Sequence, residues 1–310
     1  MSDHPHPDQV VVRNVAIATD FSPWSERATQ HAIVVAHRFG AVLHFLHTVR
    51  RSEFAIVPDM MVQLDQLAQR DCGDMIGRLK ASKSLDNVEH YCWTVDGEFA
   101  EVFESFIHEH AIDLLVLGTR GRSGLSKLLL GSLAQEIFHY VDCPVLTVGP
   151  WSRGAARKLE LRKVLFATDL TDESAAAIPY VLTAARTWHT EIDVLHVCSS
   201  AACNCRKQME SFSRKIDELA RKDVPVLITY TLLHGDPSST VLNFASQNND
   251  DLIVLGLARS RSLYGGPVLS HAYEIVRGAR CPVLSTRPGA LAVLSIPEAQ
   301  SPKSQDAAGR

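Results

Sequence analysis

The strongest chemical signal in the sequence is a glycine-rich segment that begins at Gly118, GTRGRSGLSKLLLGS. Glycines at Gly118, Gly121 and Gly131 allow main-chain N–H groups to approach phosphate oxygens closely, and Ser132 adds a hydroxyl where a helix is expected to begin. The segment is neither a Walker loop nor the dinucleotide fingerprint, because the residues that define those motifs are missing. The pattern indicates an anion site, but a strand-to-helix connection that uses its glycines only for turning fits it equally well.

A carboxylate, Asp20, follows the first apolar segment of the chain, VVVRNVAIAT, and precedes Ser22 and a helix-like pattern. Beyond the end of a parallel strand, an aspartate is a suitable acceptor for a ligand hydroxyl. An aspartate or a serine directly before a helix is also the ordinary choice for a helix cap. Both roles stay open for Asp20 at this level.

The elements that carry these residues occur twice. VAIATDFSPWSERA aligns with VLFATDLTDESAAA, so that Asp20 pairs with Asp169, 149 positions later. DLLVLG aligns with DLIVLG, so that Asp113 pairs with Asp251, 138 positions later. The first copy therefore contains 11 extra residues, which we place in a surface connection around RRSEFAIVPDMM. The 310 residues are one unit written twice.

Each copy alternates strand-like and helix-like segments. In the first copy, apolar runs predict strands over 10–19, 41–49, 88–95, 112–118 and 144–148. Helical spacing predicts helices over 22–40, 59–83, 100–110 and 132–140. This alternation predicts an α/β fold with two tandem Rossmann-like or flavodoxin-like domains, each a five-stranded parallel sheet flanked by helices. We assign residues 1–150 to the N-terminal domain and 160–288 to the C-terminal domain, and we expect a disordered tail over 289–310.

Composition narrows the class of protein. With 46% hydrophobic residues, 21% charged residues and a net charge of −4, the chain is globular, and neither a nucleic acid nor a membrane is an expected partner. We expect a cytoplasmic protein whose seven cysteines are reduced. Cys203 and Cys205 follow Cys198 and His196, but structural zinc sites prefer two to four residues between paired cysteines, so the spacing disfavours zinc at Cys203 and Cys205.

These motifs resemble those of the universal stress protein family in a tandem, two-domain form. Gly118, Gly121, Gly131 and Ser132 fit that family's nucleotide pattern of Gly, two residues, Gly, nine residues, Gly, then Ser or Thr. The segments ATDFS and CPVLTV and the His-Thr pair that ends the second strand fit it as well. The resemblance implies an adenine nucleotide alpha hydrolase-like fold and ATP, with Mg²⁺ or Mn²⁺, as the ligand.

The resemblance also implies roles for individual residues of the first copy. Those that would face the adenine or the ribose are Ala18, Thr19, Asp20, Thr48, Leu117 and Gly118. Those that would bind the phosphates are Gly121, Gly131, Ser132 and Leu133. Apart from the resemblance, the charge of Arg120 beside Gly121 suits neutralisation of the phosphates, and the alternative is a solvated loop residue. No catalytic residue is assigned.

The second copy departs from the nucleotide pattern. Arg259 stands in the place of Gly121, and Leu269 stands in the place of Gly131. Side chains at these positions intrude on the space that a phosphate needs, so we expect this copy to bind ATP weakly or not at all. It would then serve as the degenerate half of a pseudo-dimer within the chain.

The function that we expect is ATP binding by the first copy, as a regulatory or stability ligand in a cytoplasmic stress response, with an unidentified protein partner and the option of a homodimer. Two alternatives stay open. A slow ATP hydrolase needs a general base, and Asp20 lies at the wrong end of the ligand if it contacts the ribose. A scaffold that needs no nucleotide would pair the closing strands PVLTV and PVLST within the chain.

Overall fold

The computed structural model describes residues 10–49, 58–97, 99–119, 141, 143–152, 161–199, 204–220, 226–258 and 267–289. Most of the glycine-rich segment, the helix predicted over 132–140 and the tail predicted beyond residue 289 lie outside the described residues. None of the helices in the described ranges is both long enough and apolar enough to cross a membrane.

The first repeat follows the predicted alternation of strands and helices. Its described elements are β1 (Asn14–Ala18), α1 (Pro23–Phe39), β2 (Val42–Val49), α2 (Pro58–Ala81), β3 (His90–Asp96), α3 (Phe99–Glu109), β4 (Leu114–Gly118) and β5 (Val145–Val148). Local signals set the ends of α1: the Ser22 side chain accepts a hydrogen bond from the Ser25 N–H, and the helix ends at Gly40 in the left-handed region.

The second repeat has the same order of elements. Its described elements are β6 (Lys163–Ala167), α5 (Asp172–Ala175), α6 (Ile178–Trp188), β7 (Glu191–Cys198), α7 (Cys205–Ala220), β8 (Ile228–His234), α8 (Pro237–Asn248), β9 (Leu252–Gly256), α9 (Pro267–Gly278) and β10 (Val283–Thr286). The single helix α1 of the first repeat corresponds here to the short α5 followed by α6.

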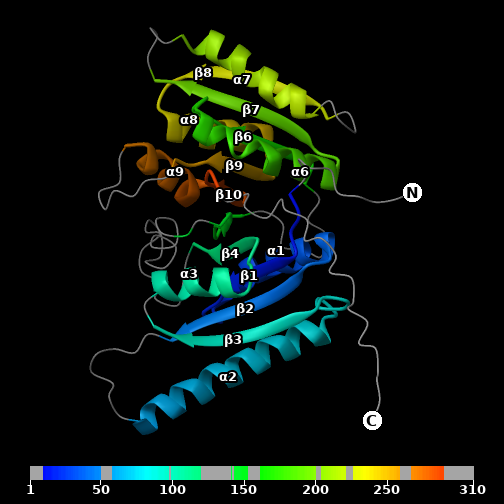
Figure 1. The fold of residues 1–310 in the computed structure, drawn as a ribbon, viewed down its shortest axis with the longest axis vertical. Helices are drawn as coiled ribbons and strands as arrows, with labels where there is room; N and C mark the ends of the chain where they lie inside the picture. The colour runs from blue at the N-terminus through cyan, green and yellow to red at the C-terminus, as the bar shows by residue number, and fades with distance from the viewer. Residues whose placement is uncertain are drawn as a thin grey trace, which may run out of the picture.

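All ten described strands belong to one sheet with the order β3-β2-β1-β4-β5-β10-β9-β6-β7-β8. Strands within each repeat are parallel, and β5 pairs with β10 in the antiparallel sense. Figure 1 shows the first repeat, coloured blue to green, at one end of this sheet and the second repeat, green to orange, at the other. The predicted α/β fold with two parallel five-stranded halves is confirmed.

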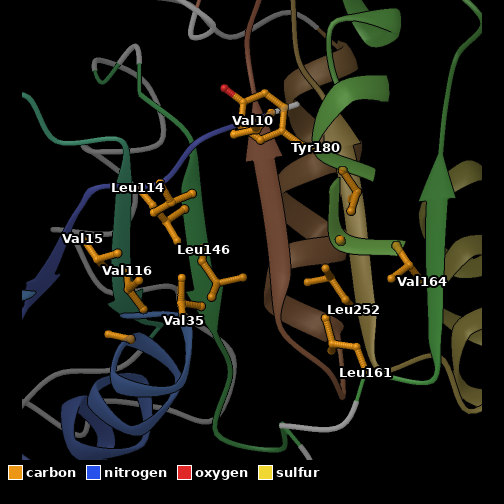
Figure 2. Packing of buried hydrophobic residues seen from close by; sticks show 14 of the residues in the cluster. Val10, Val15, Val35, Leu114, Val116, Leu146, Leu161, Val164, Tyr180 and Leu252 are labelled. Atoms are coloured by element: carbon orange, nitrogen blue, oxygen red, sulfur yellow. The ribbon is translucent and has the colours of Figure 1, made fainter. Parts of the chain in front are cut away.

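The pairing of β5 with β10 joins the two repeats into one core. Leu146 lies opposite Leu284, and the Thr147 hydroxyl donates to the Val283 carbonyl at 3.1 Å. Figure 2 shows Leu114 and Leu146 on the first-repeat side of this junction and Tyr180 on the second-repeat side, all within one buried cluster. The closing strands therefore pair within the chain, and each covers the edge that the other would expose.

Helices of the two repeats also meet across the junction. The ring of Phe39 on α1 lies 5.8 Å from the ring of Trp188 on α6, and the Arg38 guanidinium lies 6.0 Å from the centre of the same indole ring. The N–H of Val10 donates to the Thr183 hydroxyl on α6 at 3.1 Å. Contacts of this kind make each half dependent on the other for part of its buried surface.

The segment RRSEFAIVPDMM, around which we placed the 11 extra residues of the first repeat, runs into helix α2. Helix α2 has 24 residues, whereas its counterpart α7 has 16. The last four residues of the segment, 58–61, begin α2, so this part is helical and not a surface connection. Residues 50–57 before α2 and 221–225 after α7 lie outside the described residues, so the position of the extra residues stays a prediction. Figure 1 shows α2 lying along β3.

The expectation that all cysteines are reduced is wrong for Cys72 and Cys92. Cys72 is buried on α2 and forms a disulfide with Cys92, which is exposed on β3, and their Cα atoms are 6.9 Å apart. Cys205 at the start of α7 is also disulfide-bonded. The link between Cys72 and Cys92 could not be predicted from the sequence, because it depends on how α2 packs against the edge strand β3.

The disulfide between Cys72 and Cys92 should stabilise the first repeat. We expect Cys92→Ala to lower the free energy of unfolding by up to about 3 kcal/mol, because the link closes a loop of 20 residues in the unfolded chain. Denaturant unfolding under non-reducing conditions measures the change. Cys143→Ala, which removes a thiol outside this link, is the control and should cost much less. Equal unfolding midpoints for Cys92→Ala and the unchanged protein would contradict the prediction.

A buried carboxylate, that of Asp250, lies just before the amino end of β9 in the second repeat. Asp250, 6% exposed, precedes β9, and neither of its carboxylate oxygens has a hydrogen-bond partner among the described residues. The first repeat has Ile112, 5% exposed, at the equivalent position. Burial, and then the negative charge of Asp193, raise the pKa of Asp250 to about 7 although the Lys163 ammonium opposes the shift. The fold does not require this carboxylate, because an isoleucine fills the same place in the other repeat.

Asp250 should make stability depend on pH. Because its pKa is raised in the folded state, the folded protein holds a proton that the unfolded chain releases, so this contribution to stability falls as the pH rises from about 4 to about 7. We expect Asp250→Ile to raise the free energy of unfolding by up to a few kcal/mol above pH 7 and by much less near pH 4. Urea unfolding between these pH values measures the difference. Glu173→Gln, at an exposed carboxylate, is the control, and a pH-independent gain for Asp250→Ile would refute the assignment.

Candidate functional site

The predicted site residues of the first repeat gather where the strand order reverses. β1 lies between β2 and β4 and is parallel to both, so the carboxyl ends of these three strands meet at one margin of the sheet. Ala18, the last residue of β1, lies opposite Leu46 on one side and Leu117 on the other. From β1 the chain continues to β2 and β3 on one side and later returns to β4 and β5 on the other. Open α/β sheets bind ligands at such a reversal.

Small and apolar side chains form the floor of this margin. Ala18 and Leu117 are 5% and 1% exposed. Gly118 ends β4 opposite Val148 of β5, and the N–H of the next residue, Thr119, donates to the Val148 carbonyl at 3.1 Å. The end of β4 is therefore held to β5 by main-chain pairing, and Gly118 adds no side chain to either face of the sheet at this strand end.

Thr19 anchors the turn that leads from β1 into α1. Its N–H donates to the Leu46 carbonyl at 2.9 Å, and its hydroxyl accepts from the Phe21 N–H at 3.0 Å and contacts the Ser25 hydroxyl at 3.1 Å. Phe21 has a φ of 59°, in the left-handed region, which reverses the chain direction sharply. The Thr19 side chain is buried and its hydrogen bonds stabilise the turn, so a ligand would contact residues beside Thr19 and not its hydroxyl.

The structure separates the two roles that the sequence left open for Asp20. The cap of α1 is Ser22, not Asp20, because the Ser22 hydroxyl accepts from the Ser25 N–H at 3.2 Å. The Oδ1 atom of Asp20 accepts from the Ser22 N–H at 3.0 Å, within the turn itself. Asp20 is half-buried beyond the end of β1. A carboxylate oriented in this way is fixed by the turn and stands at the strand-order reversal.

Thr48 and its neighbour His47 extend β2 beyond the end of β1. Thr48 is half-buried and lies opposite Val95 of β3. A ring nitrogen of His47, Nδ1, lies 2.8 Å from the Thr19 carbonyl, and the His47 ring lies 4.7 Å from that of Phe21. His47 was not among the predicted ligand residues. His47 positions the β1 turn. The offset of 149 residues that pairs Asp20 with Asp169 also pairs His47 with His196, and this shared histidine is the sequence signal for that role.

Only part of the predicted site can be placed in the structure. Ala18, Thr19, Asp20, Thr48, Leu117 and Gly118 lie together at this margin of the sheet. The five residues assigned to the phosphates, Arg120, Gly121, Gly131, Ser132 and Leu133, lie outside the described residues. Their roles stay predictions.

The second repeat builds the same turn with the same bonds. Thr168 takes the place of Thr19, and its carbonyl lies 2.9 Å from Nδ1 of His196. The Oδ1 atom of Asp169 accepts from the Thr171 N–H at 3.1 Å, and Thr171 caps α5. The turn and its aspartate therefore belong to the fold of both repeats, and they do not by themselves distinguish a repeat that binds a ligand.

Packing accounts for the glycine that ends β9 of the second repeat. A Cβ atom on Gly256 would lie 2.4 Å from the Cα atom of Ser174 in α5 and 2.5 Å from its carbonyl oxygen. These are main-chain atoms, so a side chain at this position would displace α5. Gly256 is required by the close approach of α5, whether or not a ligand binds.

Comparisons with known proteins agree with this geometry in each half of the chain. The family model described as "Universal stress protein family" matches residues 12–149 and again 160–287. A universal stress protein of Methanocaldococcus jannaschii is 29% identical over 138 residues, which are 44% of this chain and 81% of that protein. Universal stress protein A homolog 1 of Coxiella burnetii is 30% identical over 142 residues, which are 44% of this chain and 95% of that protein.

A solved structure matches both repeats together. A universal stress protein from Archaeoglobus fulgidus aligns with a TM-score of 0.69 and 16% identity, covering 89% of this chain and 98% of that chain. At this identity the similarity establishes the fold, including the joining of the two halves. Since the family model matches once in each repeat and together these matches span most of the sequence, the chain belongs to the universal stress protein family.

Proposed function

We propose that the first repeat binds ATP, or a related adenine nucleotide, at the carboxyl ends of β1, β2 and β4. The observation that carries this proposal is the adjacency of β1 and β4 at the strand-order reversal, with Asp20 beyond one strand and Gly118 ending the other. The sequence continues from Gly118 into the glycine-rich pattern that resembles the nucleotide loop of the family. The carboxylate that would accept from a ligand hydroxyl, Asp20, thus follows β1, and the segment that would donate main-chain N–H groups follows the neighbouring strand β4.

Each described residue has a defined part in this proposal. Asp20 accepts a hydrogen bond from the ribose, Ala18 and Leu117 provide the apolar floor, and Thr48 lies against the base. The glycines and Ser132 of the loop bind the phosphates through main-chain N–H groups and a hydroxyl, with Mg²⁺ or Mn²⁺ to offset the phosphate charge. The nucleotide acts as a regulatory or stability ligand, and its occupancy changes a surface that a protein partner reads.

The second repeat acts as the structural partner of the first. It keeps the Asp169 turn, but Arg259 and Leu269 replace two of the loop glycines. Gly256 is accounted for by the packing of α5, so its presence does not argue for a second nucleotide site. One nucleotide per chain is the stoichiometry that this asymmetry favours.

The full chain should bind one ATP, and its affinity for ATP should depend on Asp20 and not on Asp169. Because the repeats share a buried junction, point substitutions in the full chain are a cleaner test than separated halves. Calorimetry with ATP and Mg²⁺ should give one site, and Asp20→Ala should weaken binding at least tenfold, since a hydrogen bond to a charged group contributes about 1.5–3 kcal/mol. Asp169→Ala, which removes the matching turn aspartate, is the control and should leave the affinity unchanged.

Gly131→Glu tests the loop in the same assay. The added carboxylate should repel the phosphates and abolish binding, while the thermal unfolding temperature without nucleotide stays near that of the unchanged protein. Two sites per chain, or equal losses for Asp20→Ala and Asp169→Ala, would contradict the assignment to the first repeat. Nucleotide recovered unhydrolysed after a single-turnover incubation supports a binding role, whereas phosphate release that Gly131→Glu abolishes would favour an ATP hydrolase.

A further inference from the structure

Three metal-ligating side chains converge at the carboxyl end of β7 in the second repeat. They are His196 and Cys198, near the end of the strand, and Cys205, the first residue of α7. The ligand atoms of the three side chains all lie within 4.8 Å of one another. Both cysteines are buried, and the histidine is half-buried. The turn from β7 to α7 thus brings together donors that are nine residues apart in the sequence.

The hydrogen bond of His196 leaves its second ring nitrogen available to a metal. Its Nδ1 atom lies 2.9 Å from the Thr168 carbonyl, which can only accept, so Nδ1 carries the proton of the neutral ring. The lone pair therefore resides on Nε2. Metal-binding histidines commonly donate their other ring N–H to a carbonyl or carboxylate in this way.

The first repeat shows that the fold does not require this cluster. His47 makes the same contact to the Thr19 carbonyl as His196 makes to that of Thr168. The residue two positions later is Val49 in the first repeat and Cys198 in the second, and Val49 occupies the end of β2 without disturbing the strand. A buried cysteine at this place is a departure from the repeat, which calls for a chemical explanation.

We propose that His196, Cys198 and Cys205 bind a zinc ion once Cys205 is reduced. Two thiolates and an imidazole suit Zn²⁺, whose tetrahedral shell leaves one position for a further donor or water. Bonds of about 2.3 Å to sulfur and 2.0 Å to nitrogen place tetrahedral ligand atoms roughly 3.5–3.8 Å apart. The three ligand atoms lie within 4.8 Å of one another, so binding shortens the distances between them by at most about 1.3 Å. The spacing of Cys203 and Cys205 alone disfavoured zinc, but the structure supplies two ligands from β7 that the spacing does not reveal.

The state of Cys205 controls the site. In the structure Cys205 is disulfide-bonded, and its sulfur is then no thiolate ligand. A dithiol reductant supplies two electrons and two protons, opens this disulfide to two thiols and itself becomes a disulfide. Zinc then bonds to the sulfur atoms of Cys198 and Cys205, and their two protons pass to solvent. The second repeat thus binds zinc under reducing conditions and excludes it under oxidising ones.

Cobalt, followed by zinc, tests the proposal on the full-length protein. After reduction with a phosphine, which does not compete for the metal as a dithiol does, one equivalent of Co²⁺ should give the visible bands of a tetrahedral ion and a near-ultraviolet thiolate charge-transfer band. Zn²⁺ should displace it. Cys198→Val, which installs the residue of the first repeat, and His196→Gln should each weaken binding at least tenfold. His47→Gln and Cys143→Ala are matched controls and should leave the spectrum and the affinity unchanged.

Each result of the cobalt experiment either supports or overturns zinc binding by the second repeat. Far-ultraviolet circular dichroism establishes that each variant is folded, and Cys198→Val carries the test if His196→Gln is not. Loss of metal binding in Cys198→Val and in the oxidised protein supports the proposal. Absence of a tetrahedral cobalt spectrum, unchanged affinity in Cys198→Val, or equal binding by the oxidised and reduced protein would overturn it. None of these readouts involves nucleotide, so the result is independent of ATP binding by the first repeat.

Discussion

The antiparallel pairing of β5 with β10 is the constraint on which the rest of the structure depends. A parallel five-stranded half would expose the main-chain donors and acceptors of its closing strand, and the pairing covers both such edges at once. It also allows one buried cluster to span the junction on one face of the sheet, while the contact of Phe39 with Trp188 joins helices of the two halves. Duplication of the unit thus provides each repeat with the partner that its edge requires.

The same pairing decides where chemistry can occur. Because the two closing strands run in opposite directions, the carboxyl ends of β1, β2 and β4 lie at one margin of the ten-stranded sheet and those of β6, β7 and β9 at the other. A ligand at the Asp20 turn and a metal at His196 therefore occupy separate margins and share no side chain. Each repeat is free to change its own margin as long as the junction and the strands are kept.

Much of the fold, and the meeting of Ala18, Asp20 and Gly118 at the ends of neighbouring strands, could be predicted from the sequence. Apolar strands alternating with amphipathic helices give the parallel halves, and the repeat of ATDFS as ATDLT gives the strand-end turn, which the bonds of Asp20 and Asp169 reproduce. What could not be predicted depends on packing between elements distant in the sequence. The bond between Cys72 and Cys92 depends on how α2 packs against β3, and the meeting of Cys198 with Cys205 depends on where α7 begins relative to the end of β7.

The comparison of equivalent positions shows where the two repeats can differ without a change of fold. The residues that the repeats share are the turn threonine, the aspartate and the strand-end histidine, and in both repeats they bond to main-chain atoms of the turn. The residues that differ, Val49 against Cys198 and Ile112 against Asp250, project from strands or strand starts whose main-chain pairing is the same in both repeats. Side chains of this second kind change the local polarity without changing the sheet register. Since one buried cluster spans both repeats, the second repeat can carry a buried carboxylate at a cost in stability that an isolated domain of half the size would bear less easily.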